Sequence, residues 1–443
     1  MPLRYPEYGR IWLGHGLSLL GGHLSTLALP LLVLHQTGSA TLAGAVGTAR
    51  MLAYLAVNLP AGALADRLPR RGALVLADLV RAAAVLVVGV GLGSGLVLPV
   101  LLLVAVGVVD TAVSALAGPA GTATLRHLVP PEDLPKALAL DSGRGLALGL
   151  VGPLIGGVLY QVAPALPFLL DALSYGVSLV LVLSVRRHLG GGAPTGTTVR
   201  QDITAGLRFV LRTRFILVFL VWAAVVNFAT AGITFGLVIV IGPAEAARLG
   251  VAMTVLTLAS LAGTALAPRL GGWNQRLLIQ ASTASSVVVG VVIAVFPHPV
   301  VIVACVAARA LLAPAAGIHF NARVFALVPD AMTARVQSTL YLIGGSLYPF
   351  ATLVSGWLCD RFSPSVAFGA FAVLLALVLG LTFTPGLGTA PPAPLADPPA
   401  EPVDSPAAAG PAMPAGPAEP GVPVPAGAGR HPPPPAGRPG RTA

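Results

Sequence analysis

Long apolar runs recur along most of this sequence, and each is long enough to cross a lipid bilayer as a helix. A spanning helix needs roughly 20 mostly apolar residues. Only 9% of the 443 residues are charged, whereas soluble domains carry roughly 25%. Reading the runs by their hydrophobicity predicts an all-α integral membrane protein with about twelve transmembrane helices. The expected spans are 11–34, 42–64, 73–94, 97–122, 137–161, 164–185, 215–241, 247–268, 276–296, 299–320, 335–358 and 364–384.

The basic residues indicate how these helices are oriented. Cytoplasmic loops carry an excess of Lys and Arg. With the N-terminus in the cytoplasm, about 20 of the 26 Lys and Arg residues fall on the cytoplasmic side, and only Arg248 and Arg361 fall outside. We therefore expect a multi-pass protein of the cell membrane with both termini cytoplasmic. The basic residues that remain lie within spans: Arg50, Arg81, Arg144 and Arg309.

The spans divide into two sets of six. The longest connection between spans, 186–214, contains GGGAPTG and separates the two sets. We expect residues 1–185 and 215–385 to form two six-helix halves, joined by this cytoplasmic loop. Residues 386–443 are rich in Pro, Ala and Gly and cannot bury a core, so we expect a disordered cytoplasmic tail.

A weak internal repeat supports this division. The LVP at 128–130 aligns with the LVP at 327–329, an offset of 199 (327 − 128), and the same alignment places Gly157 on Gly356. GALADRL at 62–68 aligns with TALAPRL at 264–270 at nearly the same offset. Doubled units of this kind are common in transporter folds.

Other classes of protein fit the sequence less well. The net charge of +10 would suit nucleic acid only as a basic face in water, and here the arginines are spread through the hydrophobic region. Cys305 and Cys359 give neither a metal-ligand spacing nor a disulfide framework. There is no H-E-x-x-H motif and no nucleotide-binding loop. We therefore expect no enzyme activity, ATP-driven pumping, metal, cofactor or nucleic-acid partner, and a monomer in the lipid bilayer.

The stretch GALADRLPRRGAL, between the second and third spans, gathers one acid and three arginines. It resembles the first signature loop of the major facilitator superfamily, of the form G-x-L-A-D-R-x-G-R-[RK]. Pro69 stands where glycine is usual, and Pro268 replaces the acid in the second-half copy. The positions that fit the signature are Gly62, Asp66, Arg67, Arg70 and Arg71.

A second signature lies in span five. GPLIGG resembles the G-P-x-x-G-G motif of antiporters, although Leu148 replaces the glycine that begins the longer form. LADLVRA, LVPPEDL and FLLDALSYGVS resemble the branch of bacterial exporters that includes macrolide efflux proteins and the enterobactin exporter. Glycines allow helices to approach closely, and a proline can kink a helix. The residues concerned are Gly149, Gly152, Pro153, Gly156 and Gly157.

The resemblance implies a cytoplasmic gate. In the family, the loop acid, here Asp66, contacts the start of span eleven, and a carboxylate is favourable at a helix N-terminus. Two further acids share a helix face with an arginine at i,i+3: Asp78 with Arg81, and Asp141 with Arg144. We interpret both pairs first as structural pairs that stabilise this gate, and second as part of proton coupling.

Asp110 differs because it lies near the middle of span four without a local basic partner. Embedded charges usually face a partner or a wet cavity. We predict that it carries a proton, with Arg50 or Arg309 as a partner that moves; the alternative is a permanent buried pair with Arg50. In the family fold, spans one, four, seven and ten line the central cavity, and their midpoints here are His23, Asp110, Asn227 and Arg309.

Two other buried polar residues have simpler interpretations. His23 could relay protons, or it could simply be hydrogen-bonded. Asp171 lies toward the outer half of span six, and we expect a structural role for it away from the cavity.

These features favour a secondary active transporter that exports a small amphipathic molecule, such as a drug, antibiotic or siderophore, in exchange for protons. Its two halves would rock about a site near the midplane. The same fold also supports a facilitator or a proton symporter that takes up a solute. A non-transporting receptor or scaffold is the alternative from another class, but it would have little reason to keep buried charges.

Overall fold

The computed structural model describes residues 4–67, 69–187, 189, 214–270, 274–328 and 333–383, and these contain helices and turns but no β-strand. Within this part of the chain, twelve segments are long and apolar enough to cross a membrane, which confirms the predicted number of spans. The expected tail lies outside the described residues, as does nearly all of the loop 186–214.

The helices fall into two groups in chain order. The first helix group consists of α1 (Pro6–Thr37), α2 (Ala40–Arg67), α3 (Arg70–Gly93), α4 (Val100–Leu128), α5 (Leu134–Val162) and α6 (Leu166–Leu183). The second helix group consists of α8 (Arg214–Ile241), α9 (Ala246–Leu266), α10 (Gln275–Val295), α11 (Pro299–Ala310), α12 (Ala313–Leu327), α13 (Thr333–Gly344), α14 (Tyr348–Arg361) and α15 (Pro364–Leu381). Short 3₁₀ turns precede α5 and α9 at Pro131–Asp133 and Pro243–Glu245, and another follows α9 at Ala267–Leu270.

Two predicted spans are interrupted helices. The tenth divides at Leu311–Leu312 into α11 and α12, and the eleventh divides at 345–347 into α13 and α14. Pro314 and Pro349 lie just after these interruptions. A proline cannot donate the backbone hydrogen bond to the residue four positions earlier, so the helix is weakest at these points.

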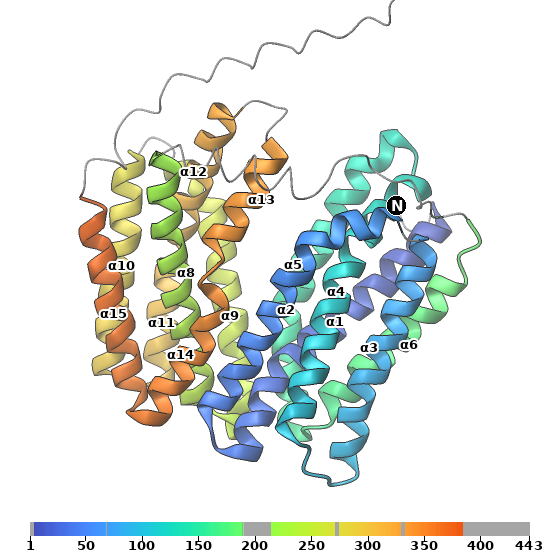
Figure 1. Ribbon diagram of the computed structural model, residues 1–443, viewed down its shortest axis with the longest axis horizontal. Coiled ribbons are helices and arrows are strands. Elements are labelled where there is room, and N and C mark those ends of the chain that lie inside the picture. The colour runs from blue at the N-terminus through green and yellow to red at the C-terminus, as the bar shows by residue number, and fades with distance from the viewer. Residues whose placement is uncertain are drawn as a thin grey trace, which may run out of the picture. The chain divides into compact units, whose positions relative to one another are not determined.

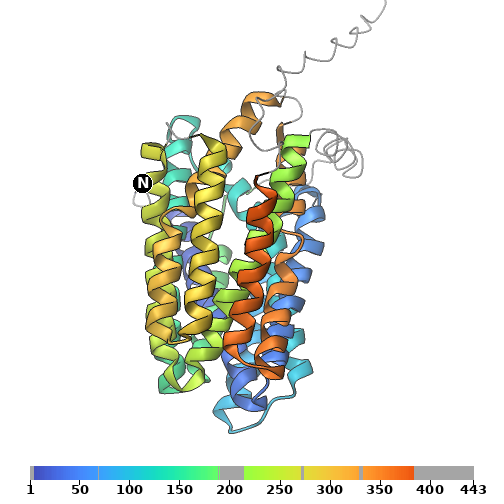
Figure 2. The same cartoon turned by 90° about the vertical axis from the view of Figure 1, so that its left-hand side faces the viewer.

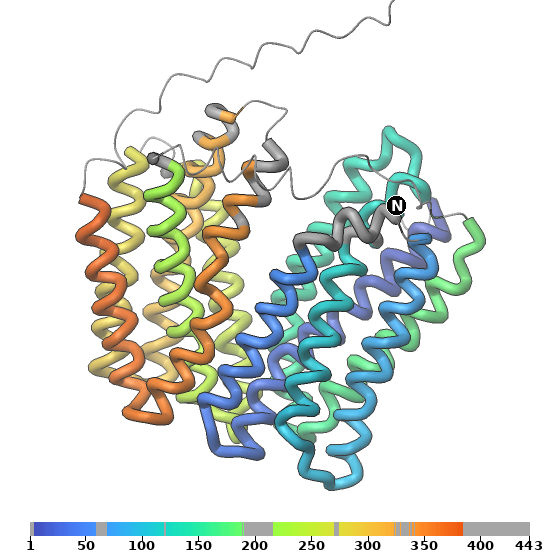
Figure 3. Tube along the Cα trace, in the orientation of Figure 1, coloured from blue at the N-terminus to red at the C-terminus, as the bar shows by residue number. Residues whose placement is uncertain are grey.

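Within each group, helices pack on their neighbours (Figures 1 and 2). In the first group, α1 packs against α5 and α6, and α3 packs against α4 and α6. In the second group, α10 packs against α15, and α8 packs against α14 and α15. The two groups are joined mainly by two helix pairs, α2 with α14 and α5 with α9, whose traces lie side by side in Figure 3.

Both pairs make their hydrogen bonds between groups toward one end of the bundle. Among the described residues, the hydrogen bonds between groups join Ser39 and the early part of α2 to α14, and they join the second half of α5 to the first half of α9. We call this the joined end; it contains the turns at Gly38–Ser39 and Phe362–Ser363. The opposite end contains Pro69, before α3, and Val129–Pro130, before α5.

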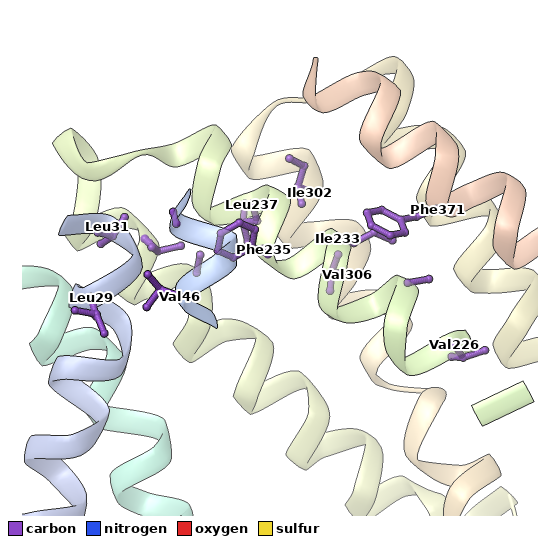
Figure 4. Packing of buried hydrophobic residues seen from close by; sticks show 14 of the residues in the cluster. Leu29, Leu31, Val46, Val226, Ile233, Phe235, Leu237, Ile302, Val306 and Phe371 are labelled. Carbon is purple, nitrogen blue, oxygen red and sulfur yellow. The ribbon is translucent and has the colours of Figure 1, made fainter. Parts of the chain in front are cut away.

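One apolar cluster extends through both groups (Figure 4). It includes Leu29 and Val46 from the first group and Ile233, Val306 and Phe371 from the second. Large apolar side chains also cover the outer faces of the helices, where Leu101 is 79% exposed and Val162 is 73% exposed. Lipid can cover such faces, which suits a chain that crosses a bilayer.

Candidate functional site

A cluster of buried charges lies at the centre of the first helix group, around Asp110 of α4. Asp110 is only 6% exposed. Arg81 of α3 donates from Nε to its Oδ1 at 2.9 Å, and the Tyr175 hydroxyl of α6 donates to the same oxygen at 3.1 Å. Nη2 of Arg50, on α2, lies 3.7 Å from Oδ2. Two cations and a hydroxyl thus surround one carboxylate, which satisfies a charge taken out of water.

The arrangement corrects the expected pairing of Asp78 with Arg81. No ion pair within 4.0 Å joins these two residues in the described part of the chain. Instead, the Asp78 carboxylate accepts hydrogen bonds from Ser178 at 2.6 Å and from Ser18 at 3.5 Å. Residues three apart on a helix point in directions about 60° apart, and here Asp78 turns toward α1 and α6 while Arg81 reaches α4. Asp110 takes its basic partners from neighbouring helices, Arg81 of α3 and Arg50 of α2, and Arg50 is one of the two candidates named from the sequence.

The other i,i+3 pair forms as its spacing indicates. Arg144 donates to Asp141 and to the backbone carbonyl of Trp12. Its guanidinium also lies 5.3 Å from the centre of the Trp12 ring. This second cluster therefore ties α5 to α1 and lies nearer the opposite end than the Asp110 cluster.

Arg50 occupies a position shared by two cavities. The larger cavity has a volume of about 810 Å³ and is lined by both helix groups. The smaller, of about 190 Å³, lies within the first group and contains Asp110, Arg81 and His23. Arg50 is held by Thr111, which accepts from its Nε at 3.0 Å, and by Thr26, which accepts from Nη2 at 3.0 Å. The residues that line both cavities are Thr26, Arg50, Tyr54 and Thr111.

The wall of the larger cavity is mainly apolar and aromatic. The rings of Phe219 and Phe320 stack with their centres 3.5 Å apart. Asn227 and Asn321 supply amides, and Nδ2 of Asn227 donates to the Gly344 carbonyl at 3.2 Å. Arg50 is the one charged side chain among its described lining residues. Such a wall suits an amphipathic organic molecule better than a small, strongly hydrated one.

The residues predicted to line one central cavity lie in two different cavities or in neither of them. His23 lines the smaller cavity, Asn227 the larger, and Arg50 both. Arg309 lines neither of these cavities and lies at the end of α11. The residues of span ten that line the larger cavity lie on α12 instead, at Gly317, Phe320 and Asn321.

The loop predicted to form a gate is described only in part. The side chains of Asp66 and Arg67, and the surroundings of Gly62, lie outside the described residues. Arg70 is buried and donates to the Leu189 carbonyl at 3.2 Å, and Arg71 donates to the Leu183 carbonyl at 2.6 Å. Both contacts stay within the first group, where these cations bind carbonyls at and beyond the C-terminal end of α6.

The glycines of span five pack two different helices against α5. A side chain at Gly152 would collide with His23 of α1, and one at Gly157 would collide with the backbone of α9 at Ala246. A side chain at Gly156 would make a tight contact with the backbone of Leu24. Gly149 faces His23 across ordinary contact distance. A side chain at Gly250 of α9 would collide with the Pro153 carbonyl. Close approach of the helices, as predicted from these glycines, is thus present on two sides of α5.

Residues 11–349 match the sequence model of the Major Facilitator Superfamily. The chain belongs to this superfamily. It is 28% identical over 382 residues to the multidrug efflux pump Tap of Mycolicibacterium fortuitum, covering 81% of this chain and 89% of the relative. It is 26% identical over 390 residues to the protein of the same name from Mycobacterium tuberculosis (strain ATCC 25618 / H37Rv), covering 83% and 89%.

Solved structures agree with this membership at the level of the fold. A crystal structure of the nucleoside transporter NupG superposes with a TM-score of 0.68 at 11% identity, covering 85% of this chain and 97% of that one. A bacterial homologue of the human lysosomal transporter Spinster, described as inward-facing and unoccupied, gives 0.64 at 16% identity, covering 86% and 97%. This member of the superfamily therefore has the fold of a family of transporters.

Sequence reasoning missed Tyr175 and Thr111, which hold the charged residues of this cluster in place. Tyr175 and Thr111 are ordinary residues of apolar helices until their partners are known. Asp171 is fully buried, and Asp110, Arg81 and Tyr175 are among its charged or ionisable neighbours. The available signal was one acid and one tyrosine four residues apart on one face of α6, Asp171 and Tyr175.

Proposed function

We propose that this protein exports small amphipathic drugs in exchange for protons, by alternating access. Two relatives named multidrug efflux pumps, matched over more than four fifths of this chain, support the drug-efflux part of the proposal. The large aromatic cavity between the helix groups supports an amphipathic substrate. The excess of basic residues in the loops supports a cytoplasmic position for the end opposite the joined end.

The shared position of Arg50 carries the coupling part of the proposal. With Asp110 ionised, its charge offsets those of Arg50 and Arg81. When Asp110 takes up a proton, the positive charge of Arg50 is no longer offset at the wall of the larger cavity. Because charge interactions are strong away from water, that change disfavours a cationic drug there. Proton binding and drug binding therefore oppose each other, as antiport requires.

The test uses purified protein in vesicles with an imposed pH gradient. Ethidium serves as a cationic aromatic probe, and a pH-sensitive dye follows protons. We expect ethidium to move against its gradient and to drive proton flux in the unaltered chain. Asp110→Asn should abolish coupled proton flux, and Asp110→Glu should keep part of it. Glu245→Gln, which changes an exposed acid paired with Arg248, is the matched control.

Three results would contradict the proposal in different ways. Coupled flux that persists in Asp110→Asn moves the proton to another acid, of which Asp141 and Asp78 come first. Ethidium movement only down its own gradient, without protons, identifies a facilitator. Uptake that is driven by protons moving in the same direction identifies a symporter.

A further inference from the structure

The acid at the end of α14 caps the start of a helix in the other group. The Asp360 carboxylate accepts from the backbone N–H groups of Ala40 at 2.8 Å and Thr41 at 2.7 Å. It also accepts from the hydroxyls of Ser39 at 2.8 Å and Thr41 at 2.6 Å. Ala40 and Thr41 are the first residues of α2 and Ser39 precedes them; the leading N–H groups of a helix have no partner within it.

The backbones of α2 and α14 are in direct contact near Asp360. A side chain at Gly356, one turn before Asp360, would collide with the Ala40 carbonyl, and one at Gly44 would collide with the backbone at Thr352. The Thr48 hydroxyl donates to the Pro349 carbonyl at 2.7 Å, and the Thr352 hydroxyl donates to the Gly44 carbonyl at 2.9 Å. Asp360 therefore ends a closely packed seam between α2 and α14.

A second seam has the same construction with a neutral cap. On α5, the side-chain carbonyl of Gln161 accepts from the backbone N–H of Ala247, in the first turn of α9, at 3.0 Å. Gly157 lies one turn earlier and packs on the start of α9. The repeat that aligns Gly157 with Gly356 also aligns Gln161 with Asp360. The two seams thus differ mainly in charge.

We propose that Asp360 is a latch that holds the joined end closed during the transport cycle. A negative charge at a helix N-terminus is stabilised by the helix dipole as well as by the hydrogen bonds. The latch must release whenever the two helix groups separate at this end. It therefore sets the balance between the two access states, while Gln161 closes the second seam without a charge.

This latch mirrors the gate expected at the other end of the same helix pair. There, Asp66 from the end of α2 is expected to contact the start of span eleven. Asp360 makes the reciprocal contact, from the end of span eleven to the start of α2. The inference rests on the proposed function, because a latch matters only if the two groups move apart.

The test measures the distance across the joined end by double electron–electron resonance between two spin labels. Spin labels are placed at Ser94→Cys in the first group and Phe296→Cys in the second, both at exposed positions, after Cys305 and Cys359 are changed to serine. The labelled protein is studied in lipid nanodiscs. Asp360→Asn should raise the ratio of long to short distances at least about fivefold, as expected for loss of a charge-assisted cap.

Three further variants make the result specific. Asp360→Glu keeps the charge and should restore most of the short-distance population. Thr41→Val removes one donor from the partner side and should shift the ratio in the same direction by a smaller factor. Asp133→Asn removes an acid that contacts Tyr5, Arg4 and Lys136, all in the N-terminal half of the chain, so it should leave the distances unchanged.

The two proposals can fail separately. An unchanged distance distribution in Asp360→Asn overturns the latch, and ethidium transport by the same preparation shows whether export stands. A shift that Asp133→Asn reproduces also overturns the latch, because it would reflect general loosening. A shift confined to Asp360 and Thr41 variants supports the latch even where proton-coupled ethidium export fails.

Discussion

At the scale of single residues, Asp110 links four helices through one carboxylate. It lies on α4 and binds Arg81 of α3 and Tyr175 of α6, with Arg50 of α2 at its second oxygen. Arg81 also lies over the Tyr175 ring, 4.3 Å from its centre. A buried charge that loses its partner is costly, whereas the complete set is tolerated. The cluster therefore contributes to stability whatever its part in transport.

Removing Arg81 should expose this dependence. Arg81→Ala leaves the Asp110 carboxylate without its closest cation, and breaking a buried pair in this way costs about 3–5 kcal/mol. The double variant Arg81→Ala/Asp110→Asn removes the charge as well, and it should lose less stability than the sum of the single variants. Thermal unfolding of the purified proteins in detergent measures both. Additive losses would show that the two residues are not coupled.

The sequence indicated the acid and Arg50 as a candidate partner, but it did not indicate Arg81 or Tyr175 as partners. Depth within an apolar run was enough to single out Asp110, because an embedded charge is rare. Its partner Arg81 was assigned instead to Asp78, on the same helix. Spacing along one helix shows which residues share a face, but not which neighbouring helix that face meets. Arg50 was correctly named as a candidate partner because it lies at a similar depth in span two.

At the scale of helices, the glycine seams decide how closely the two groups approach. Gly157 of α5 lets the start of α9 come into backbone contact, and Gly356 of α14 does the same for α2. Helix association in a bilayer depends on such close packing, because lipid is as apolar as the side chains. The sequence showed both glycines and their place in the repeat, but not which helix each would meet.

Two positions on α5 make a matched test of this packing. Gly157→Ala puts a methyl group into the backbone of α9 at Ala246, whereas nothing lies within 4 Å of the equivalent methyl at Gly143. We expect Gly157→Ala to destabilise the closed joined end by about 1–3 kcal/mol, as overpacking does. Gly143→Ala should be neutral or slightly stabilising, because Ala favours helix.

Transport and the spin-label distance across the joined end measure this difference. Gly157→Ala should slow ethidium export and lengthen the distance, and Gly143→Ala should change neither. Equal effects of the two variants would show that helix propensity, rather than contact with α9, decides the outcome.

The interrupted spans show a limit of reading hydrophobicity alone. The windows around 299–320 and 335–358 are apolar enough to predict continuous helices. Pro314 and Pro349 were visible, but a proline within a span can either kink or divide it. The cavity-lining residues of span ten lie on α12, after this division, and do not include Arg309.

At the scale of the whole molecule, the number of spans followed from the bilayer itself, which requires long apolar helices. Their orientation remains a prediction that labelling can test. In a cysteine-free chain, Ser94→Cys at the joined end should react with a membrane-impermeant maleimide added to intact cells. Lys136→Cys, at an exposed side chain near the opposite end, should react only after the cells are opened. The reverse pattern would invert the proposed topology and with it the direction of transport.

The larger cavity is lined unequally by the two helix groups. Its one described charged residue, Arg50, comes from the first group, while the second contributes aromatic, apolar and amide side chains such as Phe219, Phe320 and Asn321. On the proposed function, cells that carry this protein could therefore gain resistance to a new drug through substitutions in the second group alone. The proposed proton-coupling residues in the first group would stay unchanged. The range of drugs that such a pump exports could therefore change while its coupling to protons is kept.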